Sequence, residues 1–322
     1  MSDDMLRLHI DDESDRFYTL AFLSTQTGQA LLTRSKTGNV IDHLSADDLS
    51  GVGVPFFESE LTGAVVRLMR EAILARENAR LTLDSLISRV QTELPTMERG
   101  SPLKSGWSMR ASGLQSRMDA AHWDPVVVRL RADLAARGCR RLGEFADVQL
   151  PNWYKRHYVG AEHGRPIISG RQVLQARPVH LQYLAERSLD FEEYEFGAGT
   201  IAFGARGRAE DRLSQPTLIT QDRASWLGSE NVMRVRPKEG VDPGWIFLAM
   251  SCSQVQAQVK AGTYGAVVDV VDARRLPDIL IPPPNEDLAQ QASQCWKDFE
   301  SARALEDEAI ALIQSRIVAE TA

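Results

Sequence analysis

Two long stretches of the chain place an apolar residue at every third or fourth position. The first runs from about residue 58 to 94 and contains Leu61, Val65, Leu68, Ala72, Ala75, Ala79, Leu83, Leu86 and Val90. The second runs from about residue 286 to 319 and contains Leu288, Ala292, Cys295, Phe299, Ala302, Ile310, Ile313 and Ile317. This spacing lines one face of an α-helix, so the pattern predicts two long helical rods, the first of them roughly 55 Å long.

Each rod has a single apolar stripe and therefore needs a partner that covers it. The simplest partner is the other rod, so we expect the two helices to pair as an antiparallel coiled coil. The residues expected to make this helix pairing are Leu61, Val65, Leu68, Leu83, Leu86, Leu288, Phe299, Ile310 and Ile313. The alternative is two unrelated surface helices, each packed on a separate core.

Residues 96–284, between the rods, read as a strand-rich segment with two further helices. Asp124 and Pro125 are typical of a helix start and Gly138 of a helix end, which predicts a helix over residues 125–136. A second helix is expected over residues 244–260. Short apolar runs bounded by Gly and Pro predict strands within residues 142–150, 166–169, 200–203, 217–220, 231–235, 267–271 and 279–281. The fold class is therefore α+β.

The chain nearly repeats itself at an offset of 227 residues without a gap. Residues 6–8, 18–23, 38–44 and 52–55 lie over residues 233–235, 245–250, 265–271 and 279–282. The match continues into the two rods and indicates two related modules, each with a strand-rich end, a Pro-containing junction and a long helix. Met1 corresponds to Gly228, so the first copy is expected to be incomplete, with a strand at residues 6–9.

The repeat and the rods together predict four parts. Residues 1–56 are a remnant of the first strand-rich domain and residues 57–95 the first long helix. Residues 96–284 are a complete strand-rich domain, and residues 285–322 form the second long helix.

Charge is unevenly distributed along the 322 residues, whose net charge is −7. Residues 104–177 contain 13 Lys and Arg against 6 Asp and Glu, whereas residues 1–60 contain 4 against 11. This distribution favours an anionic partner for the middle of the chain, although a solvated surface also accounts for it. Of the 37 basic residues 31 are Arg, which suits bidentate contacts to phosphate and guanine or reflects a GC-rich genome.

The composition is that of an ordinary soluble globular protein. The chain has no apolar run long enough to span a membrane, and its acidic start lacks the pattern of a secretory signal. Cys139, Cys252 and Cys295 are far apart and read as reduced cytosolic thiols. We therefore expect a cytoplasmic location and no membrane partner.

Searches for catalytic motifs give a consistently negative result. None of the six lysines follows a carboxylate at the spacing of metal-dependent nucleases, and the chain has no Walker-type loop, dinucleotide-binding loop or nucleophilic Ser or Cys motif. The residues around Pro282 lack the acid or amide and the aromatic ring of a DNA amino-methyltransferase motif. The six histidines show no paired metal spacing. The sequence therefore indicates a non-catalytic protein without a metal site.

Residues 153–158, WYKRHY, interleave aromatic and basic side chains after a predicted strand. Such side chains contact phosphates, read base edges and stack on bases, which makes this segment a candidate nucleic-acid interface. The alternatives are that Trp153 and Tyr158 fill the domain core and that the basic loop at residues 206–208 is merely solvated. The full set of candidate DNA-binding residues is Trp153, Tyr154, Lys155, Arg156, Tyr158, Arg165, Arg171, Arg206, Arg208, Arg212, Lys260 and Tyr264.

Five segments resemble those of the specificity subunits of Type I restriction–modification systems. They are RMDAAHWDP at residues 117–125, GRPIISG at 164–170, SENVMRVRP at 229–237, GTYG at 262–265 and LPDILIPPP at 276–284. The order of these segments covers nearly the whole chain and is more specific than any one of them. The chain therefore resembles this family throughout, with a truncated first target recognition domain.

The resemblance implies a sequence-specific DNA-binding subunit that directs a partner DNA methyltransferase. In this family each target recognition domain reads one half of a split target in double-stranded DNA, and two paired helices set the spacing between the halves. The resemblance also implies that no cofactor binds this chain, because S-adenosylmethionine belongs in the partner, and that a restriction or helicase subunit is a further partner.

Other readings stay open at this point. The alternative function is a structural adaptor that assembles a defence complex through its long helices without reading DNA. The sequence leaves undetermined the target bases, the type of defence system, the oligomeric state, including a homodimer, and whether the truncated first domain contacts DNA. A free-standing enzyme conflicts with the motif searches.

Overall fold

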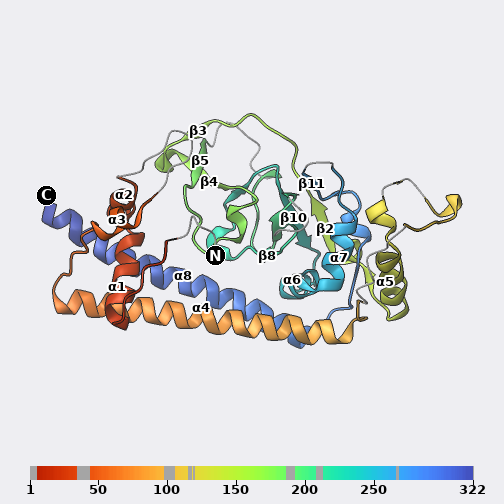
Figure 1. The fold of residues 1–322 in the computed structure, drawn as a ribbon, viewed down its shortest axis with the longest axis horizontal. Helices are drawn as coiled ribbons and strands as arrows, with labels where there is room; N and C mark the ends of the chain where they lie inside the picture. Colours follow the sequence, from red (N-terminus) through yellow and green to blue (C-terminus); the bar gives the residue numbers. More distant parts are fainter. Residues whose placement is uncertain are drawn as a thin grey trace. The chain divides into compact units, whose positions relative to one another are not determined.

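The computed structural model describes residues 6–34, 44–97, 106–114, 118, 120–185, 193–207, 213–265 and 268–321. Contacts divide the chain into two compact units, the first made of Met1–Ala79 and Asp298–Ala322 and the second of Arg80–Lys297. Two long helices, α4 (Ser59–Glu93) and α8 (Glu286–Thr321), each contribute one part to each unit (Figure 1). The two rods expected from the apolar stripes are confirmed, with bounds that differ by at most two residues.

Helices are the regular secondary structure of the first unit within its described residues. Three short helices, α1 (Glu13–Ser24), α2 (Gln26–Thr33) and α3 (Ala46–Ser50), accompany the amino-terminal part of α4 and the carboxyl-terminal part of α8. Asp12 begins α1 by accepting a hydrogen bond from the Asp15 amide, as expected of a helix N-cap. The core of this unit consists of Phe17, Tyr18, Ala21, Phe22, Val65, Val66, Met69, Ala309 and Ile313.

Within the first unit α4 and α8 run antiparallel. Arg76 pairs with Glu306 at 2.5 Å, and farther along the pair Arg316 pairs with Glu58 at 3.5 Å, so residue numbers rise along one helix as they fall along the other. The apolar sides of both helices enter the same core, which buries Val65 and Ile313 completely. This arrangement confirms the antiparallel pairing expected from the two stripes.

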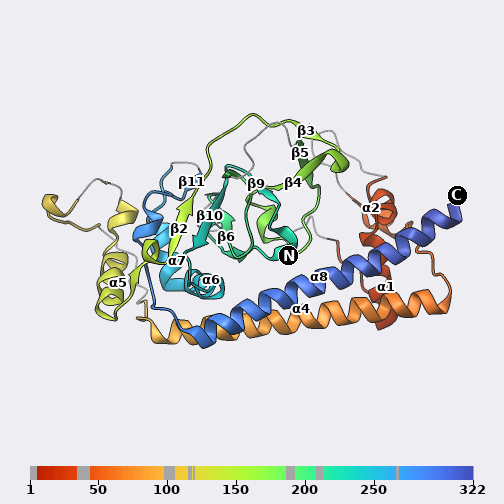
Figure 2. The same ribbon diagram turned by 180° about the vertical axis from the view of Figure 1, so that it is seen from behind.

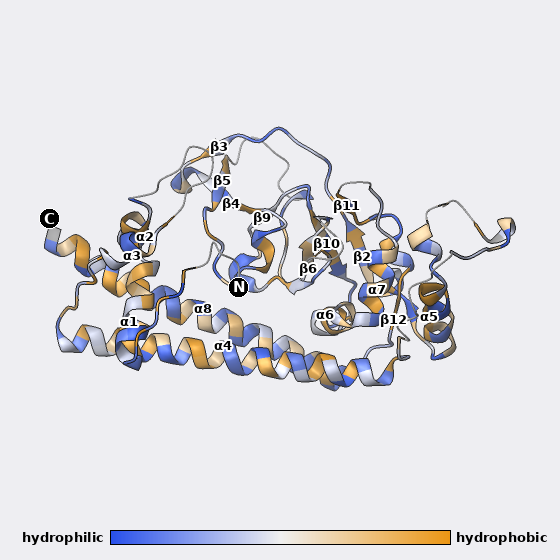
Figure 3. Ribbon diagram, in the orientation of Figure 1, coloured by the Kyte–Doolittle hydropathy of each residue, from blue (hydrophilic) through white to orange (hydrophobic). Residues whose placement is uncertain are grey.

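The residues expected to pair the helices are buried to different degrees. Val65, Leu83, Leu86, Leu288 and Ile313 are buried, whereas Leu61, Leu68, Phe299 and Ile310 are half-buried. Figure 3 shows the apolar and polar positions alternating along both helices. The stripe did not predict the buried acid Glu306, because a carboxylate is normally placed on the solvated face.

The Arg76–Glu306 pair provides a first test of the helix pairing. Glu306 is almost fully buried, with a side chain 4% exposed, and Arg76 is 31% exposed. Replacing Arg76 with Met removes the neutralising cation, so we expect the free energy of unfolding in urea to fall by roughly 1–3 kcal/mol. The double variant Arg76→Met/Glu306→Met should recover most of this loss, since it buries no charge. Equal stability of the single and the double variant would contradict the view that Arg76 neutralises a buried Glu306.

All strands of the described residues lie in the second unit (Figure 2), where they form four small sheets. A four-stranded sheet has the order β2–β10–β6–β8, formed by Ala146–Gln149, Val232–Pro237, Ile201–Gly204 and Thr217–Leu218. A second has the order β3–β5–β4–β9, formed by Tyr158–Val159, Gln182–Ala185, Gly164–Ile168 and Leu227–Gly228. Two-stranded sheets join β1 to β12 and β7 to β11, formed by Arg140–Arg141, Leu280–Ile281, Arg206–Gly207 and Asp269–Val270.

The helices of the second unit include α5 (Pro125–Ala136), which begins at Asp124 and Pro125 as predicted. The prediction of a single helix over residues 244–260 was wrong. Two helices, α6 (Pro243–Ser251) and α7 (Ser253–Ala261), occupy this stretch. The backbone of the buried Cys252 is extended, with ψ of 136°, and interrupts the helix. Neither Gly nor Pro marks this break, so periodicity alone did not detect it.

The sequence repeat corresponds to a repeat of structure. Helices α1 and α2 occupy the positions that α6 and α7 occupy 227 residues later. Tyr18 donates its hydroxyl hydrogen to the Pro55 carbonyl at 2.9 Å, and its counterpart Trp245 donates its indole N–H to the Pro282 carbonyl at 3.2 Å. In both copies an aromatic residue on the first helix therefore holds the proline that precedes a long helix.

The prediction of a strand at residues 6–9 was wrong. These residues form no strand, and Leu6 and Leu8 are 42% and 52% exposed. Their counterparts in β10 lie between β2 and β6, which supply hydrogen bonds on both sides. No strand is present in the described residues of the first unit, so residues 6–9 have among them no strand with which to pair. The two copies therefore share their helical part.

Candidate nucleic-acid interface

Backbone contacts around Asn231 bring together segments that are far apart in the sequence. The Ala205 N–H donates to the Asn231 carbonyl at 2.8 Å, and the Ser229 N–H donates to the Ile168 carbonyl at 3.0 Å. A Cβ atom added at Gly170 would lie 3.3 Å from the Asn231 carbonyl oxygen, so the backbones approach closely here. The turn of residues 229–231 therefore lies beside residues 168–170, at the end of β4, and beside residue 205, which joins β6 to β7.

This convergence brings several predicted residues to one region. Arg171 and Arg206 directly follow Gly170 and Ala205, and both are exposed. Tyr264, which is 53% exposed, forms a β-bridge with Val270. Val270 also pairs with Arg206 across the β7–β11 sheet, so this strand links Tyr264 to Arg206.

The aromatic and basic segment of residues 153–158 is divided between surface and core. Trp153 and Tyr158 are 76% and 48% exposed, and Lys155 is exposed as well. Tyr154 instead belongs to a core cluster and packs against Tyr194, with ring centroids 4.0 Å apart. Burial raises the pKa of Tyr154 to about 12, so its hydroxyl stays protonated.

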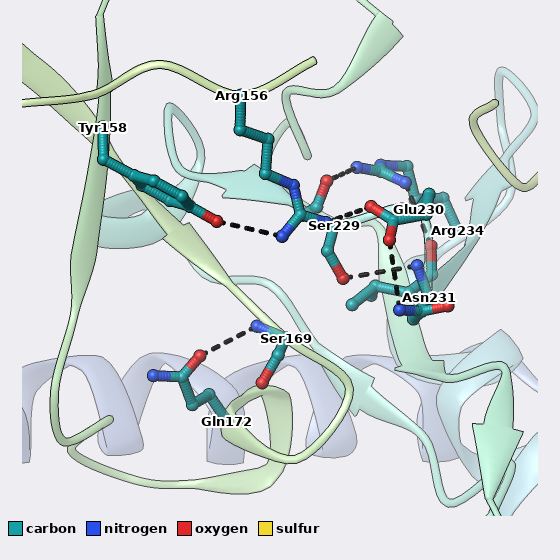
Figure 4. A network of polar contacts seen from close by, with 10 residues as sticks. Arg156, Tyr158, Ser169, Gln172, Ser229, Glu230, Asn231 and Arg234 are labelled. Carbon is teal, nitrogen blue, oxygen red and sulfur yellow. Dashed lines mark hydrogen bonds and ion pairs between the residues drawn. The ribbon is translucent and has the colours of Figure 1, made fainter. Parts of the chain in front are cut away.

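Arg156 connects this segment to the turn of residues 229–231. Its guanidinium forms an ion pair with Glu230 and donates a hydrogen bond to the Tyr158 hydroxyl at 3.1 Å (Figure 4). Asn231 donates its side-chain N–H to the second oxygen of Glu230 at 3.3 Å. Burial acts to lower the pKa of Arg156, but the hydrogen bonds to Tyr158 and Glu230 outweigh it and raise the pKa.

Arg234 is a fully buried arginine on β10. Its guanidinium donates to three backbone carbonyls, those of Val232 at 3.0 Å and of Tyr194 and Gly228 at 2.8 Å each. Burial lowers the pKa of Arg234 to about 10, and the charge of Arg236 acts in the same direction. Arg234 therefore ties β9 and the segment of Tyr194 to β10, and it fixes the turn that carries Glu230.

The remaining predicted residues have varied surroundings. Arg165 forms an ion pair with Glu195 at 2.6 Å. Lys260 is half-buried near the end of α7, and its carbonyl accepts a hydrogen bond from the Thr263 hydroxyl. Arg208 and Arg212 lie outside the described residues.

Sequence reasoning missed Glu230, Asn231 and Arg234 as residues of this region. They lie in the segment 229–237, which resembles a strand of the family, but an acidic residue beside a predicted DNA-binding segment is not an expected contact. An arginine in an apolar strand, such as Arg234, was the available signal for a buried charged residue.

The described residues were compared with two other kinds of feature, a metal site and a membrane-spanning helix. No group of three or more His, Cys, Asp or Glu residues among them is arranged to hold a metal ion. Nor does any helix in the described ranges have the length and apolar character needed to cross a membrane.

The chain is similar to solved specificity subunits of Type I restriction–modification systems. No protein-family model and no curated protein matches it. The HsdS subunit from Thermoanaerobacter tengcongensis is 15% identical with a TM-score of 0.36, over 92% of this chain and 68% of that one. The S subunit from M. genitalium is 13% identical with a TM-score of 0.40, over 94% of this chain and 74% of that one. A structure that describes complex assembly and conformational transition of the type I R-M system is 14% identical with a TM-score of 0.40. The match covers 93% of this chain and 67% of that one.

Proposed function

We propose that this chain recognises a DNA sequence and directs a partner methyltransferase to it. The observation that carries the proposal is the convergence of the segments bearing Arg156, Arg171, Arg206 and Tyr264 at the turn of residues 229–231. These residues are separated by up to about a hundred positions in the sequence and come from the strand-rich second unit, which resembles a target recognition domain.

The side chains of this region divide into groups suited to different parts of DNA. Lys155, Arg171 and Arg206 are exposed cations and suit phosphates, whose charge supplies most of the non-specific affinity. Trp153 and Tyr158 present exposed rings. Arg156, Glu230 and Asn231 supply the donors and acceptors needed to read base edges. The region therefore combines groups suited to affinity with groups suited to readout.

The long helices are the proposed site of assembly. Partner methyltransferase and restriction or helicase subunits would bind this scaffold in the cytoplasm, and S-adenosylmethionine would bind to the methyltransferase. This division of labour follows from the resemblance of the chain to specificity subunits, in which recognition and chemistry belong to different chains.

The second candidate is a structural adaptor that holds partners together and does not read DNA. The ion pairs of Arg156 with Glu230 and of Arg165 with Glu195 favour this reading, because they neutralise two of the predicted DNA contacts. The two candidates differ in one property, which is selective binding to duplex DNA.

Selection from a library of randomised DNA duplexes tests the proposal. The purified full-length chain is expected to enrich one defined sequence, and mapping of methylated sites in cells with and without the gene should identify the same sequence. Binding of all duplexes with equal affinity, together with an unchanged methylation map, would leave the adaptor as the better reading.

Replacement of Lys155 with Ala should weaken binding to all duplexes by a similar factor. Because Lys155 is exposed, the fold should be unaffected, and the slope of log affinity against log salt should decrease by about one. Arg80→Ala is the matched control, since Arg80 is exposed on α4 in the same unit. A salt titration in which both variants keep the wild-type slope would remove Lys155 from the interface.

A further inference from the structure

We infer that Arg156 and Glu230 together read one G·C base pair of the target. The inference rests on the proposed function and assigns one element of its specificity. The two side chains come from segments 74 positions apart and lie in contact as an ion pair, so tertiary structure alone creates the pair.

The chemistry of the pair matches the edge of a G·C base pair. In the major groove guanine presents two acceptors, O6 and N7, and cytosine presents the N4 amino group as a donor. A guanidinium suits the first and a carboxylate suits the second. Arg156 and Glu230 place these two groups side by side, as guanine and cytosine are placed within one base pair.

The surroundings of the pair support reading rather than a purely structural role. The side chains are 24% and 13% exposed, so both are accessible in part, in contrast to the fully buried Arg234. A carboxylate near a phosphate backbone is repelled unless a cation offsets its charge, and Arg156 offsets the charge of Glu230. Glu230 can therefore lie within the group of segments that carries the exposed Arg171 and Arg206.

The pair is also positioned before DNA binds. The Tyr158 hydroxyl accepts a hydrogen bond from Arg156 at 3.1 Å, and the Arg156 guanidinium lies 5.5 Å from the centre of the Tyr154 ring. Asn231 holds Glu230 from the other side. These contacts restrict both side chains in the free protein, which lowers the entropy lost on binding.

The main test exchanges the two residues in the double variant Arg156→Glu/Glu230→Arg. This variant keeps an ion pair at the same place and reverses the order of the donor and acceptor groups. Selection from randomised duplexes with the full-length chain should show that wild type prefers G·C at one position by roughly 5- to 150-fold. The exchanged variant should prefer C·G at this position and keep the rest of the target.

Selection of the wild-type target by a folded exchanged variant would overturn the inference and assign the pair a structural role. If the exchanged variant does not fold, Arg156→Lys replaces it as the test. Lysine retains the ion pair with Glu230 but loses the bidentate donor geometry of arginine. The inference expects relaxed preference at one base pair for Arg156→Lys, whereas an unchanged target would overturn it. Failure of wild type to select any duplex would instead refute the proposed function itself.

Discussion

Replacement of Val65 with Asp is expected to unfold the first unit. Val65 is fully buried in a core that also contains Met69 of α4 and Ile313 of α8. A carboxylate placed there has no counter-charge among the apolar side chains of this cluster, and we expect a loss of about 4 kcal/mol or more in the free energy of unfolding. This is a large part of the stability of a typical domain. Chemical denaturation followed by circular dichroism measures the loss.

Leu81→Asp is the matched control for this change. Leu81 lies on the same helix, α4, and is 68% exposed, so the same new charge stays in water. Its stability should remain within about 0.5 kcal/mol of wild type. Similar unfolding curves for the two variants would contradict the described core, in which one side of α4 is buried and Leu81 lies away from it.

The second large loss in the free energy of unfolding is expected for Arg234→Met. Methionine fills most of the space but donates no hydrogen bond, so the carbonyls of Tyr194, Gly228 and Val232 lose their arginine donor in a buried region. Removal of a buried charge offsets part of this cost, as the lowered pKa of Arg234 indicates. We expect a net loss of about 3 kcal/mol, because three carbonyls are affected at once.

The same variant should lose selective DNA binding before it loses its fold. The carbonyl of Gly228 immediately precedes the turn of residues 229–231, so the position of Glu230 depends on Arg234. Arg206→Met, the same change at an exposed residue, should leave stability unchanged within about 0.5 kcal/mol while weakening DNA binding. Thermal melting and duplex selection on both variants separate these effects, and wild-type selectivity in a destabilised Arg234→Met variant would show that the turn needs no such support.

Much of the fold followed from local sequence signals. The apolar stripes predicted α4 and α8 to within two residues, and Asp124 and Pro125 predicted the start of α5. Each of the seven short apolar runs contains at least part of a strand. These signals suffice where the secondary structure depends on periodicity or on a cap, both of which are properties of neighbouring residues.

Two local predictions were wrong where neighbours in space decide the structure. Residues 6–9 match the sequence of β10 but form no strand, because β10 is held by β2 and β6 on its two sides. The single helix expected over residues 244–260 is interrupted at the buried Cys252. Strand pairing and packing of this kind are absent from a local pattern.

The sequence by itself determined the two rods and the repeat of the chain at an offset of 227 residues. It also identified residues 153–158 as the first candidate site. Tertiary structure decided which of its side chains face solvent, since Trp153 is exposed and Tyr154 is buried. It also decided the electrostatics, because Arg156 meets an acid 74 positions away while Lys155 beside it remains exposed. Coulomb interactions depend on distance in space, whereas sequence position fixes distance only between close neighbours along the chain.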